Sequence, residues 1–257
     1  GVPLIAKIEK PTALDDLAAI VREADGVMVA RGDLGVELSP EQVPIAQRRI
    51  VRTARAHGKP VIVATHMLES MVEALVPTRA EANDVATAVY QGADAVMLSA
   101  ESAVGRHPTA AVAIMDRIIR AIETDRDANP SSQAAPAPAT VTTADACALA
   151  ASKLADDLDC PMVVFTRSGS SAQRVSATRP RQPIHALTPQ LSTARKLSLI
   201  WGVSADLEPE EPKSFDDILD AVSRHEAASG IKRFVITAGY PYASDNSTDT
   251  IKVVERK

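Results

Sequence analysis

The chain has 257 residues, of which 46% are hydrophobic and 24% are charged. These values are typical of a folded protein with one or two hydrophobic cores. The formal net charge of −5 and the aromatic content of 3% give no reason to expect a nucleic-acid or anionic-membrane partner. No apolar run approaches the roughly 20 residues of a membrane span, and charges at Lys7, Glu9 and Lys10 interrupt the first apolar stretch, so no signal peptide is expected.

The two cysteines, Cys147 and Cys160, lack metal-ligand spacing and lie beside apolar residues. This context predicts buried free thiols, and the absence of disulfide-type spacing agrees with a cytoplasmic location.

The first half of the sequence alternates short apolar runs with helix patterns. Strands are predicted over 4–8, 27–30, 60–64 and 95–98, and helices over 13–24, 41–56, 79–90 and 109–123. Thr12 is the expected cap of the first helix. Continuous apolar strands suit a parallel sheet that is buried on both faces. Four such units correspond to half of a TIM-type (β/α)₈ barrel, which needs about 250 residues for eight units. An open four-stranded sheet is the alternative.

A segment without periodicity separates the two halves. Residues 129–140 read NPSSQAAPAPAT and include three prolines, a composition that favours a linker. We therefore expect a barrel-type domain over 1–126, a linker over 127–140 and a second domain over 141–257. A loop within a single domain would give the same local composition.

The second half alternates helices and strands again. Helices are expected over 143–157, 170–178, 192–201 and 214–228, and strands over 162–166, 183–187, 203–207, 234–238 and 250–255. This order predicts a separate α/β sandwich domain with a mostly parallel sheet.

Charged and hydroxyl-bearing residues follow the apolar runs of the first half. Glu9 and Asp33 each come just after a predicted strand, and Lys7 precedes Glu9 by two residues. Because the carboxyl ends of parallel strands face the ligand, the two carboxylates are candidate ligands of Mg²⁺ or Mn²⁺. Lys7 could stabilise charge on a phosphoryl group or an enolate. Surface acids and a lysine paired with an acid are the structural alternatives.

Three further segments occupy comparable positions. The residues Ala30, Arg31, Gly32 and Asp33 belong to a glycine-containing segment that could bring backbone N–H groups close to an anionic substrate. Thr65 ends the third strand and could relay a proton through water. Ser99 and Glu101 follow the fourth strand in the same way.

A hydroxyl-rich turn follows the first strand of the second half. Thr166, Ser168, Gly169 and Ser170 precede or open a predicted helix, so they could hold a phosphate group of an effector. A capped helix start without a ligand is the alternative.

Five stretches together resemble the pyruvate kinase family. They are KIEK at 7–10, MVARGDLGVE at 28–37, GKPVIVATHMLESM at 58–71, PTRAEANDVATAV at 77–89 and GADAVMLSAESAVGRHP at 92–108. The second half is similar to the C-terminal α/β domain of that family. Two local departures are His66, where the family usually has Gln, and Ala100, where Gly is common.

The resemblance implies phosphoryl transfer from phosphoenolpyruvate to ADP, which gives pyruvate and ATP. It assigns Lys7 to the transferred phosphoryl group, Glu9 and Asp33 to the divalent metal, the 30–33 backbone to the substrate carboxylate and Thr65 to proton delivery. Ser99 and Glu101 belong to the nearby relay. It also implies K⁺ in the complete enzyme, a phosphorylated effector and a homo-oligomer, a tetramer in complete members.

Family members carry another half-barrel and a lid domain before the lysine strand. We therefore expect this chain to be a fragment, the C-terminal portion of such an enzyme, and to be inactive when isolated. One part of a split protein and a degenerate homologue are the alternatives. A metal-dependent enolate lyase or aldolase of similar barrel and a non-catalytic metabolite-binding module are the competing functions.

Overall fold

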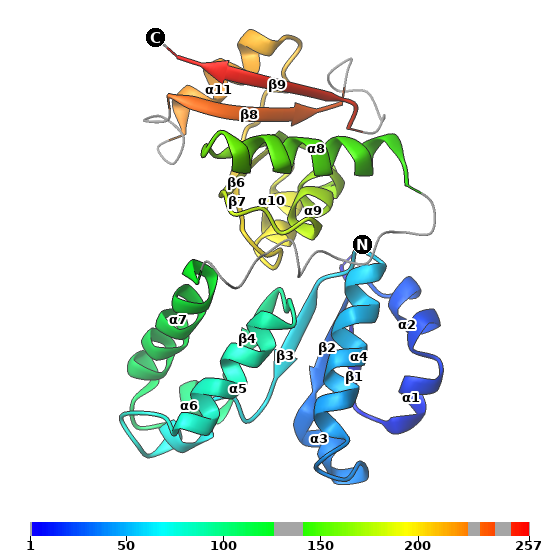
Figure 1. The fold of residues 1–257 in the computed structure, drawn as a ribbon, viewed down its shortest axis with the longest axis vertical. Helices are drawn as coiled ribbons and strands as arrows, with labels where there is room; N and C mark the ends of the chain where they lie inside the picture. Colours follow the sequence, from blue (N-terminus) through cyan, green and yellow to red (C-terminus); the bar gives the residue numbers. More distant parts are fainter. Residues whose placement is uncertain (1, 126–140, 226–231, 240–247, 257) are drawn as a thin grey trace. The chain divides into compact units, whose positions relative to one another are not determined.

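The computed structural model describes residues 2–125, 141–225, 232–239 and 248–256. The chain divides into two compact units, Gly1–Pro136 and Ala137–Lys257, which are described separately below (Figure 1). The predicted linker and the end of the helix predicted over 214–228 lie outside the described residues.

The first unit is built on a four-stranded parallel sheet. Its strands are β1 (Ile5–Ile8), β2 (Gly26–Ala30), β3 (Val61–Ala64) and β4 (Ala95–Met97), and they lie side by side in chain order. The pairing is parallel throughout, with Lys7 opposite Met28 and Ala30 opposite Ala64. Sequential parallel strands joined by helices are the repeating unit of a (β/α)₈ barrel.

Helices connect and cover these strands (Figure 1). They are α1 (Pro11–Asp15), α2 (Leu17–Glu23), α3 (Arg31–Glu37), α4 (Val43–Ala56), the 3₁₀ turn η1 (Glu69–Val72), α5 (Arg79–Tyr90), α6 (Ala100–Ala103) and α7 (Pro108–Thr124). Helix α4 shows how the pattern produces the packing, because Ala46, Ile50 and Ala54 recur every four residues and are all buried. Ile50 and Ala54 enter the same core as the valines of β2 and β3.

Two expectations about the first unit are wrong. The helix predicted over 13–24 is two helices separated at Asp16, and it begins at Pro11 because proline suits the first helical position. Thr12 is therefore inside the helix and does not cap it. The sequence pattern predicts no helix over 31–37, where the structure forms α3 (Arg31–Glu37).

The second unit is a five-stranded sheet in the order β7-β6-β5-β8-β9. Its elements are α8 (Thr143–Asp157), β5 (Met162–Phe165), α9 (Ser170–Ala177), β6 (Ile184–Thr188), α10 (Leu191–Leu197), β7 (Val203–Leu207), α11 (Phe215–Arg224), β8 (Arg233–Ala238) and β9 (Thr250–Glu255). Only β9 runs antiparallel to its neighbour among the described strands. Helix α10 ends at Leu197, four residues before the predicted end.

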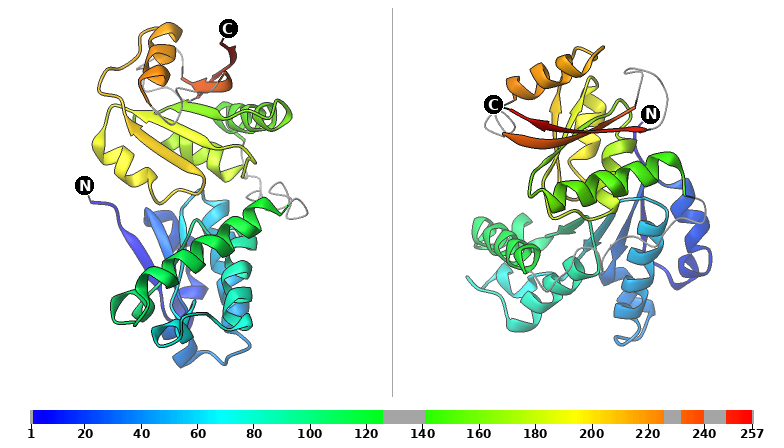
Figure 2. Two further views of the ribbon diagram at one scale, coloured as in Figure 1. Left: turned by 90° about the vertical axis from the view of Figure 1, so that its left-hand side faces the viewer. Right: turned by 45° about the horizontal axis from the view of Figure 1, so that its top comes forward.

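Alternate residues of β5 enter two different cores. Met162 and Val164 pack with alanines of α8 and α9, whereas Val163 and Phe165 pack with residues of α11. This alternation follows from the two-residue period of a strand, and α8 and α11 accordingly lie on opposite sides of the sheet (Figure 2). The predicted α/β sandwich with a mostly parallel sheet is confirmed.

The thiols and the helices test two further expectations. Both cysteines are free, but Cys147 is only partly buried, so the prediction of a buried thiol holds for Cys160 and is wrong for Cys147. In the part of the chain that the structure describes, no helix combines the length and apolar character needed to cross a bilayer.

Candidate active site

Lys7 lies between two carboxylates at the carboxyl end of β1. Its ammonium group forms an ion pair with Glu9, and its Nζ is 3.9 Å from Oδ2 of Asp33 in the first turn of α3. The hydrogen bond to Glu9 and the charge of that carboxylate raise the pKa of Lys7 above its ordinary value, and Asp33 acts in the same direction. Lys7 therefore keeps its positive charge at neutral pH.

Two of these three side chains, Glu9 and Asp33, carry groups that can ligate a divalent cation. Glu9 and Asp33 already face a common positive charge, and carboxylate oxygens are the ligands that Mg²⁺ and Mn²⁺ prefer. Among the described residues, no group of three or more His, Cys, Asp or Glu side chains could form a complete metal site. A metal held by this pair would take its remaining ligands from substrate and water.

Thr65 follows β3 and makes contact with the segment after β2. Its Oγ1 accepts a hydrogen bond from the Gly32 N–H at 2.8 Å and donates one to the Ala64 carbonyl at 2.7 Å. Thr65 and His66 both adopt positive φ angles, 69° and 53°. Such angles are rare for residues other than glycine, and a β-branched residue is an outlier there.

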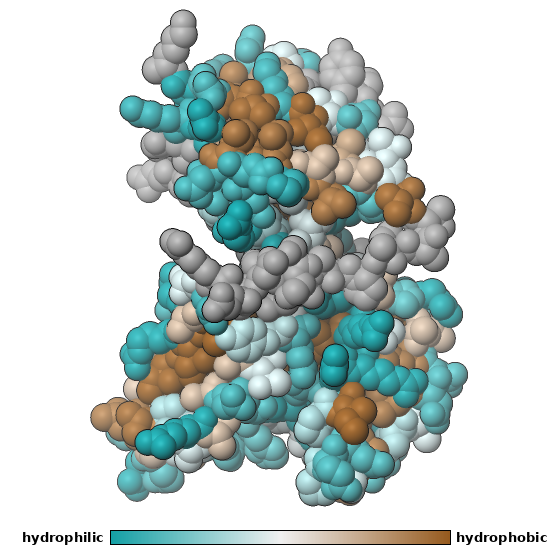
Figure 3. Space-filling model, viewed as in Figure 1, coloured by the Kyte–Doolittle hydropathy of each residue, from teal (hydrophilic) through white to brown (hydrophobic). Residues whose placement is uncertain are grey.

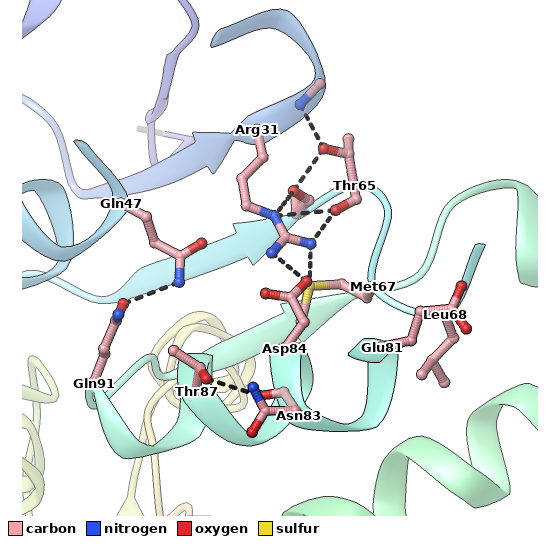
Figure 4. A network of polar contacts seen from close by, with 12 residues as sticks. Arg31, Gln47, Thr65, Met67, Leu68, Glu81, Asn83, Asp84, Thr87 and Gln91 are labelled. Atoms are coloured by element: carbon pink, nitrogen blue, oxygen red, sulfur yellow. Dashed lines mark hydrogen bonds and ion pairs between the residues drawn. The ribbon is translucent and has the colours of Figure 1, made fainter. Parts of the chain in front are cut away.

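Arg31 turns its side chain toward this turn (Figure 4). Its guanidinium donates to the carbonyls of Ala64 and Thr65 and pairs with Asp84 of α5 at 2.5 Å. The Arg31 side chain is only 10% exposed. Of the expected substrate-binding residues, Arg31 is thus engaged with protein groups.

Glu101 joins the turns that follow β3 and β4. Its Oε1 accepts the Leu68 N–H at 3.1 Å, and its Oε2 accepts the Ser99 N–H at 2.7 Å. The residue is 0% exposed. Both carboxylate oxygens therefore serve backbone groups, which offsets the cost of burying the charge.

These contacts link four strand ends in sequence. Lys7 reaches Asp33, Gly32 reaches Thr65, and Glu101 reaches both the 65–68 turn and Ser99. The carboxyl end of this sheet thereby brings together a cation, two carboxylates, backbone N–H groups and a hydroxyl. This set can neutralise an anionic substrate and exchange protons with it.

Helix α5 holds the segment that follows β3 through hydrogen bonds of Glu81. Glu81 accepts hydrogen bonds from the Ser70 N–H of η1 at 2.7 Å and from the Thr78 N–H at 2.8 Å. Although burial opposes the effect, the hydrogen bonds from Ser70 and Thr78 lower the pKa of Glu81 below its ordinary value. Asp84 lies one turn further along the same helix.

The hydroxyl-rich turn of the second unit lies at the carboxyl end of β5. Thr166 is buried, and its Oγ1 accepts the Gly169 N–H at 3.0 Å. Gly169 has φ 89°, and an added Cβ would lie 3.3 Å from Leu197, so this position requires glycine. Ser168 and Ser170 are joined by a 3.1 Å hydrogen bond, and Gly169 supplies no side-chain cap to α9.

Sequence reasoning missed Asp84, Met67 and the left-handed turn. Asp84 lies inside a predicted helix without any local signal, and its importance appears only once the buried Arg31 is placed beside it. The turn at 65–66 contains no glycine or asparagine, the residues by which positive φ angles are usually recognised.

Comparisons with known proteins decide the family. Residues 1–112 match the sequence model of the pyruvate kinase barrel domain, and residues 145–254 match that of the pyruvate kinase alpha/beta domain. The chain belongs to the pyruvate kinase family.

Individual pyruvate kinases agree with this assignment. A pyruvate kinase of Agrobacterium vitis is 50% identical over 257 residues, which cover 98% of this chain and 53% of that protein. One from Mycobacterium tuberculosis is 42% identical, again over 98% of this chain and 53% of the relative. The crystal structure of a Cryptosporidium parvum pyruvate kinase matches with a TM-score of 0.88 at 33% identity, over 100% of this chain and 52% of that one. The chain spans about half the length of the relatives it matches.

Proposed function

We propose that this chain carries the proton-transfer and metal-binding part of a pyruvate kinase active site. The observation that supports this most strongly is the linked series of strand ends from Lys7 to Ser99 in a chain of this family. In the proposed reaction the bond between phosphorus and the enol oxygen of phosphoenolpyruvate breaks, and a new bond forms to a β-phosphate oxygen of ADP. The enolate carbon then takes a proton, which gives pyruvate.

Lys7 stabilises negative charge on the phosphoryl group during transfer. Its raised pKa keeps it protonated at neutral pH, and its exposed position leaves it accessible to substrate. The backbone from Ala30 to Asp33 binds the substrate carboxylate.

Thr65 delivers the proton to the enolate carbon through water. Its hydroxyl is held at the end of β3 by Gly32 and Ala64. Ser99 and Glu101 complete this relay, and Glu101 also keeps the two neighbouring turns together.

Glu9 and Asp33 would hold Mg²⁺ or Mn²⁺. Such an ion, when bound, would offset negative charge on the substrate oxygens. The use of K⁺ is proposed on family grounds alone, and none of the residues described above is assigned to it.

Two further proposals concern regulation and assembly. Thr166, Ser168, Gly169 and Ser170 would bind a phosphate group of an effector, since hydroxyl groups and a glycine lie at the N-terminus of α9. A homo-oligomer, with a tetramer as the complete form, is supported by exposed apolar side chains such as Val76, Val104 and Val112. Apolar surface is visible over the part of the first unit that contains α5 and α7 (Figure 3).

A chimera tests the proposed function. The chain would be joined to the part of the Agrobacterium vitis relative that it does not span, and ATP formation from phosphoenolpyruvate and ADP would be measured. We expect turnover that is lost in the Glu9→Gln and Asp33→Asn variants, with weaker Mn²⁺ binding in both. A folded chimera without turnover, or full Mn²⁺ affinity in both variants, would contradict the proposal.

A further inference from the structure

The turn after β3 holds Thr65 in an unfavourable backbone conformation. Thr65 and His66 both lie in the left-handed region, which is unfavourable for residues other than glycine unless the surroundings enforce it. A turn of this kind persists only where specific contacts compensate. The Arg31 side chain supplies several of them.

Arg31 binds the turn through two nitrogens of its guanidinium group, Nε and Nη2 (Figure 4). Its Nε is 3.3 Å from the Ala64 carbonyl oxygen and 3.1 Å from that of Thr65, and its Nη2 contacts the Thr65 carbonyl and, at 2.8 Å, the Met67 sulfur. Three parts of the turn are therefore fixed by one planar group.

Asp84 holds the remaining side of the guanidinium. Its Oδ2 is 2.5 Å from Nη1 of Arg31, and the pair offsets the cost of burying a charge that is nine-tenths covered. Asp84 belongs to α5, so the helix fixes the arginine and the arginine fixes the turn. The ion pair with Arg31 is the contact through which Asp84 supports the turn.

These contacts bear on the position of the Thr65 hydroxyl. Oγ1 accepts the Gly32 N–H at 2.8 Å with the Thr65 backbone at φ 69°. Arg31 and Gly32 are adjacent in the chain, so α3 holds the turn with the Arg31 side chain and donates the Gly32 N–H to the threonine hydroxyl. The Arg31 contact to the Thr65 carbonyl and the Gly32 contact to Oγ1 together set the direction of the hydroxyl.

We propose that Arg31, held by Asp84, is a positioning residue that aims the Thr65 hydroxyl. The Arg31 side chain then acts through Thr65 and not by contact with substrate, and Asp84 and Met67 join the site as its support. Lysine could not replace Arg31, because an ammonium group cannot present a planar set of donors to two carbonyls, a sulfur and a carboxylate together. The catalytic consequence rests on the proposed function, whereas the geometric one does not.

Amide hydrogen exchange in the 257-residue chain tests the geometric part. Exchange at the Gly32 N–H would be followed by NMR in the wild type and in the Asp84→Ala and Arg31→Lys variants. The Asp116→Ala variant is the matched control, since it removes an exposed carboxylate from an ion pair with Arg120 in the same unit. We expect exchange at Gly32 to accelerate at least about tenfold in both test variants relative to the β2 amides, and to remain unchanged in the control.

The comparison with β2 separates local release from general destabilisation. Equal acceleration of Gly32 and the β2 amides would overturn the proposal, as would wild-type exchange at Gly32 in both variants. Where Arg31→Lys does not fold, Asp84→Asn takes its place, and a smaller acceleration than in Asp84→Ala is expected because one acceptor oxygen remains.

The catalytic part is measured in the chimera. Asp84→Ala should lower the exchange of pyruvate methyl protons at least about tenfold and leave the KM for ADP unchanged, because Thr65 acts on carbon and not on the nucleotide. Unchanged proton exchange with a raised KM for ADP would overturn it. If the wild-type chimera shows no turnover, the proposed function fails while the Gly32 measurement still decides the positioning role.

Discussion

At the residue level, the feature on which the proposed reaction depends is the placement of charges around Lys7. The ammonium lies between Glu9 and Asp33, which raise its pKa and hold it over the carboxyl end of the sheet. The three residues come from two neighbouring strand ends, so their meeting follows directly from parallel pairing of β1 with β2.

Replacing Lys7 should separate the two halves of the proposed reaction. In the chimera, Lys7→Met should reduce ATP formation by at least about a thousandfold, because the cation that offsets charge on the phosphoryl group is lost. Exchange of pyruvate methyl protons should persist, since Thr65 serves carbon. Lys10→Met, a nearby exposed lysine, is the control, and near-normal turnover in Lys7→Met would refute the role given to Lys7.

A second charge change tests the turn in the other unit. Ser170→Glu should abolish binding of sugar phosphates or nucleoside monophosphates, because a carboxylate at the first position of α9 repels a phosphate group. Ser204→Glu adds the same charge on the exposed part of β7 and should leave binding intact. Calorimetric titration with both ligand classes gives the result, and equal affinity in the two variants would remove this turn from consideration.

Much of the candidate site was accessible from sequence, and the reason is geometric. Parallel strands end at a common edge, so Lys7, Glu9, Asp33, Thr65 and Glu101 could be grouped before any coordinates. Their catalytic roles stay predictions. The support from Asp84 was not accessible, because it depends on where one turn of α5 falls against a buried arginine.

At the level of elements, reciprocal caps fix where the helices begin. Thr78 and Glu81 form a capping box at α5, and similar boxes open α8 and α11. The start of α5 at Arg79 and that of α8 at Thr143 agree with the predicted boundaries. The first helix was misplaced because Pro11, and not Thr12, sets its beginning.

The capping box of α5 should make stability depend on pH. The pKa of Glu81 is lowered from an ordinary value of 4.5, so its contribution is fully present above that value. It is lost as pH falls through the ordinary value and then through the lower folded one. The difference in unfolding free energy between wild type and Glu81→Gln should therefore be larger at pH 7 than at pH 3.

Urea unfolding at several pH values measures this difference. Thr78→Ala should lose about 1 kcal/mol at neutral pH through the same cap, and Glu37→Gln at the exposed end of α3 serves as the control. A gap between wild type and Glu81→Gln that is constant or grows toward low pH would contradict a lowered pKa of Glu81 in the folded state.

At the level of the whole molecule, the two units differ in the number of core clusters that pack on their sheets. The second unit has separate cores on both faces of its sheet. Within the described residues of the first unit, β1 and β4 are edge strands, and edge strands tend to pair with other chains. Sequence pattern predicted both folds, because apolar strands and amphipathic helices alternate clearly in each half.

The second unit should fold when produced alone. A polypeptide of residues 141–257 should show a cooperative thermal transition, because each face of its sheet is packed against its own helices. Ile218→Ala, which opens the α11 core, should lower the midpoint, whereas Ser204→Glu should not. A polypeptide without a cooperative transition would show that the unit depends on the rest of the chain.

The 257-residue chain by itself should form no ATP from phosphoenolpyruvate and ADP. It spans about half the length of its relatives, and a site that lacks several transition-state contacts loses many powers of ten in rate. Lys7→Met, purified from the same host, measures the background from contaminating enzyme. Wild-type chain should match that background, while the chimera exceeds it and loses the excess on the same substitution. Turnover by the chain alone that disappears in Lys7→Met would instead mean that its four strand ends hold all the groups that phosphoryl transfer requires.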